Sequence, residues 1–509
     1  MKPEIDPITL AVLSGGLRAI CDEMGAALIR SAHSPNIKER RDCSTALFDP
    51  TGELVIQAEH IPVHLGSMPD AVAAVIAESP EPEPGDLWIL NDPFRGGTHL
   101  PDITLVSPLF AAGRRLGWAA SRAHHADVGG PTPGGMPADS RRLEDEGMVI
   151  APRRVDEDGL AELARLMRNP RQRLADLRAQ RAANLLGQRR LAELSEQRGV
   201  ELVVAGLSAL LDYSESRSRK AIADLPDGRY RATDQLETPA GVRVPLQVEV
   251  AIAGDCVRVD FAGSASQVDG NLNCPLPVTR AAALFALRVL LDPDAPPSAG
   301  GHRPIEISAP AGSVLNARPG AAVAAGNVET SSRVADVVFA ALAEVADGPA
   351  QGQGTMNNLT LAGGEDGSAF TYYETLGGGQ GACRDADGPS GVHVAMSNTL
   401  NTPTEALEME LPVRVRRLEL RRGSGGAGAR SGGDGIIREI EAPVPMRYTL
   451  IAERRSGGPR GLDGGEHGEA GCDYLNDERI RAKGEGELIP GDILRIETPG
   501  GGGHGKAGA

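Results

Sequence analysis

The stretch DLWILNDPFRGGTHLPDITLVSPLFAAGRRLGWAASRAHHAD, residues 86–127, decides the fold of the first part of the chain. It contains three short apolar runs, at residues 86–90, 103–110 and 117–124, which are separated by Gly, Pro, Asn and Asp. Short apolar runs between turn residues predict buried β-strands. Histidines and aspartates stand where these runs begin and end, which is where functional sites are commonly built.

The residues before this stretch predict a helix and a hairpin. Asp6 is a good N-cap and Pro7 suits the first helical turn. Apolar residues recur at helical spacing from there to Ser34-Pro35, where the helix should end. Residues 44–57 read as a β-hairpin around a Pro-Thr-Gly turn. We therefore expect an N-terminal α/β metal-binding domain over residues 1–154.

The pattern then changes twice along the chain. Residues 155–225 are rich in Arg, Ala, Leu and Glu at helical spacing, which predicts a helical segment. From residue 226 the apolar period becomes two, and residues 246–261 predict a hairpin with its turn at Gly254-Asp255. Helices are expected at 278–291 and 328–345, within an α+β domain over 226–350. Residues 351–509 should form a β-rich, Gly-rich C-terminal domain, so the fold class is α+β multidomain with a β-rich C-terminal half.

Composition excludes several classes of protein. The chain has 509 residues and a net charge of -17, which argues against nucleic acid or an anionic membrane as partner. No apolar run approaches the ~20 residues of a membrane span, and the N-terminus has no signal-peptide pattern. The six cysteines are scattered without a CxxC pair, so we expect neither a disulfide framework nor a zinc finger. A cytoplasmic protein is the expectation.

Two glycine motifs resemble phosphate-binding loops but lack their context. Residues 423–428 match GxGxxG, yet a strand-like segment follows instead of the required helix. Residues 500–506 match GxxxxGK, but Ala507 replaces the Ser or Thr of a P-loop. We expect both to be glycine-rich loops, and any ATP to bind a different chain.

Histidines and acids concentrate between residues 42 and 127 and suggest a metal site. His99 and Asp102 lie three apart on a turn before a strand, so both can reach one ion. Imidazole and carboxylate ligands together suit Zn, Mn or Fe. Asp42 and either His124 or His125 stand at further strand ends, and the residues alone do not choose between these two histidines. For each histidine taken singly, a hydrogen-bonded structural role is the better interpretation.

Long stretches of the chain resemble the hydantoinase B/oxoprolinase family. They include KERRDCSTALFDPTGELVIQAEHIPVHLGSMP from Lys38, NDPFRGGTHLPDITLVSPLF from Asn91, RAHHADVGGPTPGGMP from Arg122, GNVETSSRVADVV from Gly326, YETLGGGQGA from Tyr373, SGVHVAMSNTLNTP from Ser390 and ETPGGGGHG near the end. The resemblance implies a divalent metal held by Asp42, His99, Asp102 and His124, and so selects His124 over His125. It also implies a hydantoinase A-type partner that binds ATP-Mg and phosphorylates the carbonyl oxygen of the substrate.

The expected function is that of the B-type component of an ATP-dependent hydrolase acting on a hydantoin, 5-oxoproline or similar cyclic amide, within a hetero-oligomer. Phosphorylation makes the amide oxygen a leaving group, and a divalent metal can orient a carbonyl or lower the pKa of a water. His125 and Asp127 are the candidate catalytic groups for proton transfer, with His60 and His64 beside them; hydrogen bonds that fix loops are an equal alternative. His393 has no assigned role. The alternatives are a component of a biotin-independent ketone carboxylase and, less compatible with the His and Asp cluster, a non-catalytic scaffold.

Overall fold

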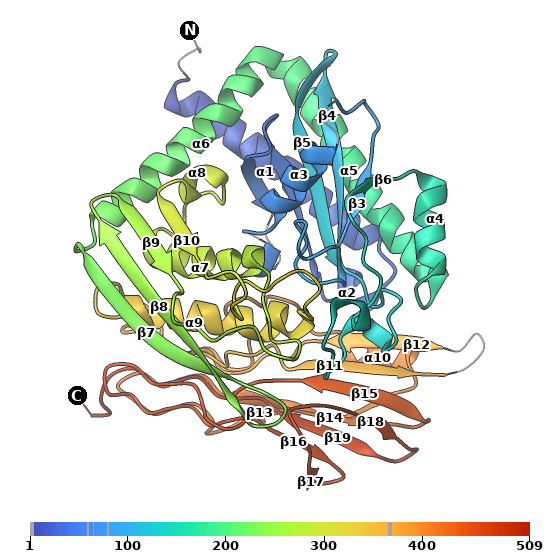
Figure 1. Ribbon diagram of the computed structural model, residues 1–509, viewed down its shortest axis with the longest axis vertical. Helices are drawn as coiled ribbons and strands as arrows, with labels where there is room; N and C mark the ends of the chain where they lie inside the picture. The colour runs from blue at the N-terminus through green and yellow to red at the C-terminus, as the bar shows by residue number, and fades with distance from the viewer. Residues whose placement is uncertain (1–4, 59–60, 65, 79–80, 365–368, 509) are drawn as a thin grey trace.

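The computed structural model describes residues 5–58, 61–64, 66–78, 81–364 and 369–508, and within these ranges its strands form four sheets (Figure 1). The chain is an α+β protein, as the sequence predicts. Strands of the first two sheets each come from one stretch of chain, whereas strands of the last two alternate along the C-terminal part. The boundaries of the four expected domains stay a prediction.

The N-terminal sheet is antiparallel throughout and has the strand order β2-β1-β5-β4-β3-β6. Its strands are β1 (Cys43–Phe48), β2 (Leu54–Ala58), β3 (Trp88–Leu90), β4 (Asp102–Ala111), β5 (Arg114–His124) and β6 (Arg153–Arg154). The expected hairpin at 44–57 and the three expected strands are therefore confirmed. Nearly every residue of β1, β4 and the second half of β5 is buried, because helices cover both faces of the sheet.

Three long helices cover one face of this sheet, and a shorter helix covers the other. The long helices are α1 (Pro7–Ser31), α5 (Pro170–Arg198) and α6 (Val200–Ala223), and α4 (Glu157–Arg165) precedes α5 and α6 in the helical segment. Leu13, Leu17 and Met24 of α1 share a core with residues of α5, α6 and the sheet. On the other face α3 (Met68–Glu78) packs against Trp88 and Trp118. The predicted helical segment exists, and α5 packs directly on the N-terminal sheet.

The middle sheet has the order β10-β9-β8-β7 and packs on two helices. Its strands are β7 (Gly228–Glu237), β8 (Arg243–Ala253), β9 (Cys256–Asp260) and β10 (Ile305–Ser308), and the helices are α7 (Leu276–Leu291) and α9 (Ser331–Leu342). The alternation of exposed and buried residues along β8 confirms the predicted hairpin with β9. A π-helical turn, η4 (Gly326–Thr330), leads directly into α9, so helical backbone covers the start of the helix expected at 328–345, and α9 ends at Leu342, before the expected end.

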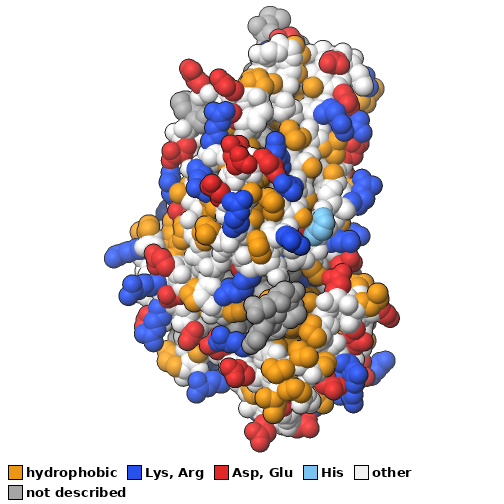
Figure 2. All heavy atoms as spheres, turned by 90° about the vertical axis from the view of Figure 1, so that its right-hand side faces the viewer, with side chains coloured by type: hydrophobic (Ala, Val, Ile, Leu, Met, Phe, Trp, Pro, Cys, Tyr) orange, Lys and Arg blue, Asp and Glu red, His pale blue; other side chains and the backbone are white. Residues whose placement is uncertain are grey.

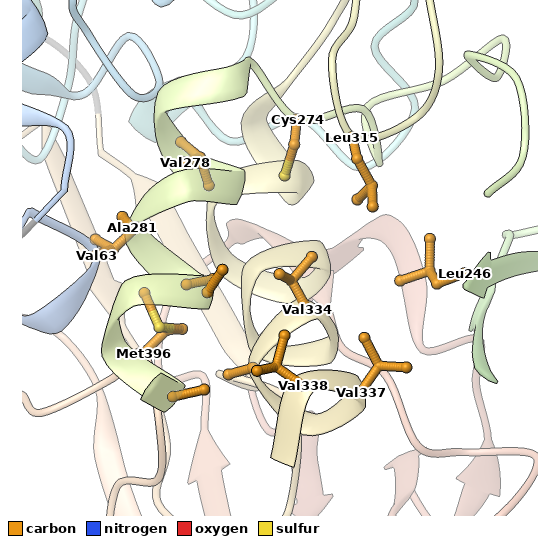
Figure 3. Close-up of a cluster of buried hydrophobic side chains, with 14 of the residues drawn as sticks. Val63, Leu246, Cys274, Val278, Ala281, Leu315, Val334, Val337, Val338 and Met396 are labelled. Carbon is orange, nitrogen blue, oxygen red and sulfur yellow. The ribbon is translucent and has the colours of Figure 1, made fainter. Parts of the chain in front are cut away.

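One hydrophobic cluster connects this middle part to the loops around the site described below. Figure 3 shows Val334 and Val338 on α9, which lies beside α7. Ala281 of α7 lies next to Val63, on the side of α7 away from α9, and Met396 belongs to the same cluster. Val63 belongs to the short helix η1 (Pro62–His64) and Met396 to a C-terminal loop. The core therefore packs a segment of the N-terminal part of the chain against a loop of the C-terminal part.

The C-terminal part contains two further sheets, which lie below the middle part in Figure 1. One has the order β12-β11-β15-β18, with β11 (Asn358–Gly363), β12 (Phe370–Glu374), β15 (Met446–Ile451) and β18 (Lys483–Leu488). The other has the order β13-β14-β19-β16-β17, with β13 (Arg414–Arg421), β14 (Gly435–Glu441), β16 (Cys472–Leu475), β17 (Glu478–Arg479) and β19 (Ile493–Glu497). The remaining short helices are α2 (Pro35–Lys38), α8 (Ala299–His302), α10 (Thr404–Glu410), η2 (Pro133–Gly135) and η3 (Leu143–Asp145).

Both glycine motifs are backbone-packing elements, as their predicted loop character implies. Gly426 donates to the carbonyl of Gly501, which itself donates to the carbonyl of Gly433, each at 2.8 Å. A Cβ atom on Gly500 would lie 1.9 Å from the carbonyl oxygen of Ser424, so only glycine permits this approach. The glycines thus allow several chain segments to hydrogen-bond side by side, and no helix follows either motif within the described residues.

Two expectations from composition also agree with the structure. All six cysteines are free thiols. None of the helices in the described ranges combines the length and the apolarity that crossing a bilayer requires. One face of the molecule, seen in Figure 2, carries basic and acidic side chains interspersed with small apolar groups.

Candidate metal centre

The register of β1, β5 and β4 brings three of the predicted ligands together at one end of the N-terminal sheet. Asp102 begins β4 and lies directly opposite His124, the last residue of β5. Asp42 precedes β1, and its carbonyl oxygen accepts a 3.0 Å hydrogen bond from the backbone N–H of His124. Paired residues on antiparallel strands have Cα atoms only ~4.5–5.5 Å apart, so pairing alone makes these side chains neighbours.

The fourth predicted ligand, His99, joins the group through a tight turn. The backbone N–H of Asp102 donates to the carbonyl of His99 at 3.1 Å, which folds the two side chains onto the same side. Nε2 of His99 lies 3.3 Å from Oδ2 of Asp102, and Nδ1 of His124 lies 3.6 Å from Oδ1. Ligand atoms of these three residues all lie within 4.8 Å of one another. Asp42 completes the group, with Oδ2 3.9 Å from Nδ1 of His124.

The histidines of the cluster have free ring nitrogens. Neither ring nitrogen of His99 makes a hydrogen bond within the described residues, and Nε2 of His124 makes none either. Burial and the neighbouring His99 lower the pKa of His124 well below its usual value, which keeps the ring neutral. A neutral imidazole with an unused lone pair is the form that binds metals.

The two carboxylates of the cluster have pKa values shifted in opposite directions. Burial, together with the charge of Asp102, raises the pKa of Asp42 to about 8. Burial also opposes ionisation of Asp102, but His99 and His64 outweigh it and hold the pKa of this carboxyl well below its usual range. A cation between the two carboxylates would relieve their repulsion. Free imidazole nitrogens, paired carboxylates and the absence of sulfur among the four residues therefore fit a Zn, Mn or Fe ion.

Neighbouring side chains fix the orientation of Asp102. Thr98 donates its hydroxyl to Oδ2 of Asp102 at 2.5 Å, and Nε2 of His64 lies 3.5 Å from the same oxygen. Nδ1 of His64 is in turn 2.9 Å from the hydroxyl oxygen of Ser44 on β1. Such partners of a ligating carboxylate orient it and tune its basicity.

A small buried cavity adjoins the cluster. It is lined by Asp42, Asp102 and His124 from the N-terminal sheet and by Tyr373, Thr375 and Thr399 from the C-terminal part. Its volume of about 20 Å³ accommodates roughly one water molecule. The site is therefore built between the N-terminal sheet and the C-terminal part of the chain.

Tyr373 on β12 packs its ring flat against His124, with ring centroids 4.5 Å apart and an interplanar angle of 8°. Its hydroxyl donates to Oδ1 of Asn358 at 2.7 Å, and Nδ2 of Asn358 donates to Oε1 of Glu329 at 2.8 Å. Glu329 is fully buried on the π-helical turn before α9, a local geometry that often marks functional sites. Burial and the nearby Glu453 raise the pKa of Glu329 to about 7.

The other predicted residues lie close by with different partners. His125 is buried and its Nε2 lies 2.9 Å from Oε1 of Gln180 on α5. Asp127 accepts hydrogen bonds from the backbone N–H groups of Gly129 and Gly134 and from Arg168, so it fixes its loop. Neither His125 nor Asp127 lines the cavity, and a role in proton transfer for either stays a prediction. His60 lies outside the described residues.

The match to a family model extends over residues 6–507, and the model is that of hydantoinase B/oxoprolinase. The chain belongs to the hydantoinase B/oxoprolinase family. This confirms the resemblance that the quoted stretches indicate.

Curated members of the family include proteins of different length. The chain is 39% identical to 5-oxoprolinase 1 of Arabidopsis thaliana over 539 residues, covering 98% of this chain but 42% of that protein. It is 31% identical to a Pseudomonas protein that is provisionally named as the B-type component of a D-/L-hydantoinase, covering 99% of this chain and 90% of that protein. The chain thus spans about two fifths of the plant protein and nearly all of the bacterial one.

Two solved structures share the fold of this hydantoinase B/oxoprolinase chain. The ATP-dependent caprolactamase of Pseudomonas jessenii superposes with a TM-score of 0.92 at 27% identity, over 99% of this chain and 92% of that one. A nucleotide-free acetone carboxylase superposes with a TM-score of 0.89 at 19% identity, over 98% and 76% of the two chains, and this likeness concerns the fold alone.

Among the C-terminal residues of the site, the sequence drew attention to His393 but not to Tyr373, Thr375 or Thr399. Tyr373 appears only inside a family-matching stretch, and no spacing marks its contact with His124, which arises from long-range packing. Arg40 belongs to the same charged run as Asp42 and could have been found there. His393, left unassigned, lies behind the cavity wall: its ring nitrogens are 2.7 Å and 3.1 Å from the hydroxyls of Ser397 and Thr399.

Proposed function

We propose that this chain is the metal-binding, B-type component of an ATP-dependent enzyme that hydrolyses a cyclic amide such as a hydantoin or 5-oxoproline. The observation that carries the proposal is the cluster of Asp42, His99, Asp102 and His124 beside a buried cavity, with ring nitrogens that have no partner in the described part of the chain. Family membership and the names of the relatives, which are 5-oxoprolinase, hydantoinase and caprolactamase, supply the substrate class.

Asp42, His99, Asp102 and His124 would hold the divalent ion, either Zn, Mn or Fe. Such an ion polarises a carbonyl group or activates a water for attack. Thr98 and His64 hold the carboxylate of Asp102 in place, and Tyr373 supports the ring of His124. A ligand set held by strand register and by packed neighbours is preorganised, which reduces the cost of reaching the reactive geometry.

Of the two groups proposed for proton transfer, His125 is the better candidate. Its Nδ1 atom has no hydrogen-bond partner within the described residues, whereas both carboxylate oxygens of Asp127 accept hydrogen bonds. Burial lowers the pKa of His125, so the neutral ring would act first as a proton acceptor. Asp127 would keep the adjacent loop in the shape that positions His124 and His125.

ATP-Mg would bind an A-type partner in a cytoplasmic hetero-oligomer. Both glycine-rich motifs of this chain are occupied by backbone packing, and the name of the Pseudomonas hydantoinase component implies a companion chain. Hydrolysis is preferred over ketone carboxylation because the likeness to acetone carboxylase concerns the fold alone. A scaffold without chemistry would have no use for a buried cluster of His and Asp whose ring nitrogens lack hydrogen-bond partners among the described residues.

The test combines metal analysis with coupled turnover. The purified chain alone should contain about one divalent ion and show no ATP hydrolysis stimulated by hydantoin, 5-oxoproline or caprolactam. Co-purified with an A-type partner encoded beside it, it should show such stimulation and ring opening. Substrate-stimulated ATP hydrolysis by the lone chain, or bicarbonate-dependent carboxylation of a ketone without amide hydrolysis, would contradict the proposal.

A further inference from the structure

Arg40 is a buried cation with an unusual set of partners. Its side chain is completely buried, and it forms no ion pair with a carboxylate in the described part of the chain. Two other buried arginines are paired with carboxylates: Arg333 with Asp234 and Glu453, and Arg173 with Asp176. Buried Arg122 also donates only to hydroxyl and carbonyl oxygens, but it does so through Nε and both Nη atoms. A buried charge normally needs an opposite charge, because leaving water is costly for an ion.

Only one nitrogen of the Arg40 guanidinium is used. Nη2 lies 2.7 Å from both the carbonyl oxygen and the hydroxyl oxygen of Thr375, and 2.9 Å from the hydroxyl oxygen of Thr399. Nε and Nη1 are buried and have no hydrogen-bond partner within the described residues. The guanidinium therefore retains donors for a further acceptor, and a fork of N–H groups is the geometry that recognises an oxyanion.

The residues that Arg40 contacts also line the cavity beside the metal centre. Thr375, Ser397 and Thr399 face the same space as Asp42, Asp102 and His124. The hydroxyls of Thr375 and Thr399 are 2.7 Å apart, and His393 is hydrogen-bonded to Ser397 and Thr399 from behind. Arg40 thus lies behind Thr375 and Thr399, the two residues through which it reaches the wall of the cavity.

We propose that Arg40, with the hydroxyls of Thr375, Ser397 and Thr399, forms an oxyanion subsite next to the metal centre. The subsite takes a carboxylate or phosphoryl oxygen of the substrate, and this assignment rests on the proposed function for the identity of that substrate. Two sources share this chemistry: the carboxylate of a 5-oxoproline-like ring, and the phosphoryl group that a partner places on the amide oxygen. The oxyanion supplies a charged acceptor for Nε and Nη1 of Arg40, which have no hydrogen-bond partner in the described part of the chain.

The dimensions of the cavity favour binding of one group rather than of a second molecule. The space is about 20 Å³, roughly one water, so an oxygen of the bound group occupies it. Among buried groups a charge-assisted hydrogen bond is stronger than at the surface. Arg40 would thereby fix the orientation of the reacting group relative to Asp42, Asp102 and His124.

The test measures binding by the full chain and needs neither ATP nor turnover. Inorganic phosphate and 5-oxoproline are titrated calorimetrically into wild type, Arg40→Gln and the control Arg189→Gln, which alters an exposed arginine of α5. Loss of one charge-assisted hydrogen bond should weaken binding about 10- to 140-fold in Arg40→Gln, and the control should match wild type. Arg40→Lys, which keeps the charge but loses the fork, should fall between them.

Comparison of the probes identifies the source of the oxyanion. If the subsite takes the ring carboxylate, 5-oxoproline binds in an Arg40-dependent way and 2-pyrrolidinone, the same ring without the carboxylate, does not. If it takes the phosphoryl group, the Arg40 dependence appears with inorganic phosphate. Equal affinity of wild type and Arg40→Gln for both anions, or binding of neither anion by wild type, overturns the proposal.

If Arg40→Gln does not fold, two smaller changes in the cavity wall still test the subsite. Ser397→Ala and Thr399→Val each remove one hydroxyl from the cavity wall and should weaken anion binding about 2- to 10-fold. Unchanged affinity in both variants contradicts the subsite. Metal content is measured on the same samples, so that the metal centre and the oxyanion subsite are tested separately. A chain that contains no metal but binds anions through Arg40 would refute the metal centre alone.

Discussion

Replacing Glu329 by glutamine should make the variant more stable, relative to wild type, at neutral and alkaline pH than in acid. Glu329 is fully buried, and its Oε1 accepts hydrogen bonds from the backbone N–H of Met356 and from Asn358. Its Oε2 has no partner within the described residues. Glutamine keeps the accepting oxygen and the shape of the protonated acid but cannot ionise.

The size of the effect follows from the shift in pKa. Burial, and next the charge of Glu453, raises the pKa of Glu329 from 4.5 to about 7, against the opposing attraction of Lys483. The folded protein therefore binds this proton more tightly than the unfolded chain does. The contribution of this proton to the free energy of unfolding is complete below pH 4.5 and is lost as the pH rises through 7. A shift of about 2.5 units at roughly 1.36 kcal/mol per unit gives a loss of about 3 kcal/mol.

Thermal unfolding of wild type and Glu329→Gln between about pH 4.5 and 8.5 measures this difference. At roughly 2.1 cal/mol/K per residue, a chain of this length shifts its midpoint by about 1 °C per kcal/mol. The midpoint of the variant should therefore gain about 3 °C on wild type between about pH 4.5 and 8. Other buried acids titrate equally in both proteins, so their effects cancel in the difference.

Glu410→Gln is the control, because Glu410 is exposed at the end of α10. Its midpoint should follow wild type at every pH. If the unfolding midpoints of Glu329→Gln and wild type differ by the same amount at every pH, Glu329 has the same pKa in the folded and the unfolded chain. A variant that loses stability relative to wild type as the pH rises would show that the ionised carboxylate is the stabilising form, and either result refutes the reasoning.

Three further outcomes test the site and the fold. His99→Ala should lose the bound divalent ion while retaining its circular dichroism, whereas His125→Ala should retain the ion; elemental analysis in which His99→Ala keeps full metal content would contradict the proposed ligand set. Gly501→Ala should lower the free energy of unfolding by about 3 kcal/mol, because its Cβ would lie 2.0 Å from a backbone oxygen, whereas Gly457→Ala, with no atom within 4 Å, should behave as wild type in the same melts. Asp6→Ala should destabilise the protein by about 0.5–2 kcal/mol, since Asp6 caps α1 through two backbone N–H groups; an unchanged unfolding midpoint would show that this cap contributes nothing.

Local patterns predicted the elements whose causes are local. The cap at Asp6 and the helical period that follows it give α1, and the period of two with a Gly-Asp turn gives the hairpin of β8 and β9. The helical period did not reveal the π-helical turn at Gly326–Thr330, where buried Glu329 accepts a hydrogen bond from the distant backbone of Met356. The boundaries of the domains are not decided by such patterns.

For the site, the pattern of residues was enough to show which segments carry His and Asp side chains of the kind that bind metals. Family resemblance then preferred His124 over His125. Only the tertiary structure places these two histidines apart: adjacent residues at the end of a strand point to opposite sides, so His124 approaches Asp102 while His125 approaches Gln180 on α5. The roles of Tyr373 and Arg40 also emerge only from the tertiary structure. Their contacts join segments that are distant in sequence, and such contacts leave no local pattern.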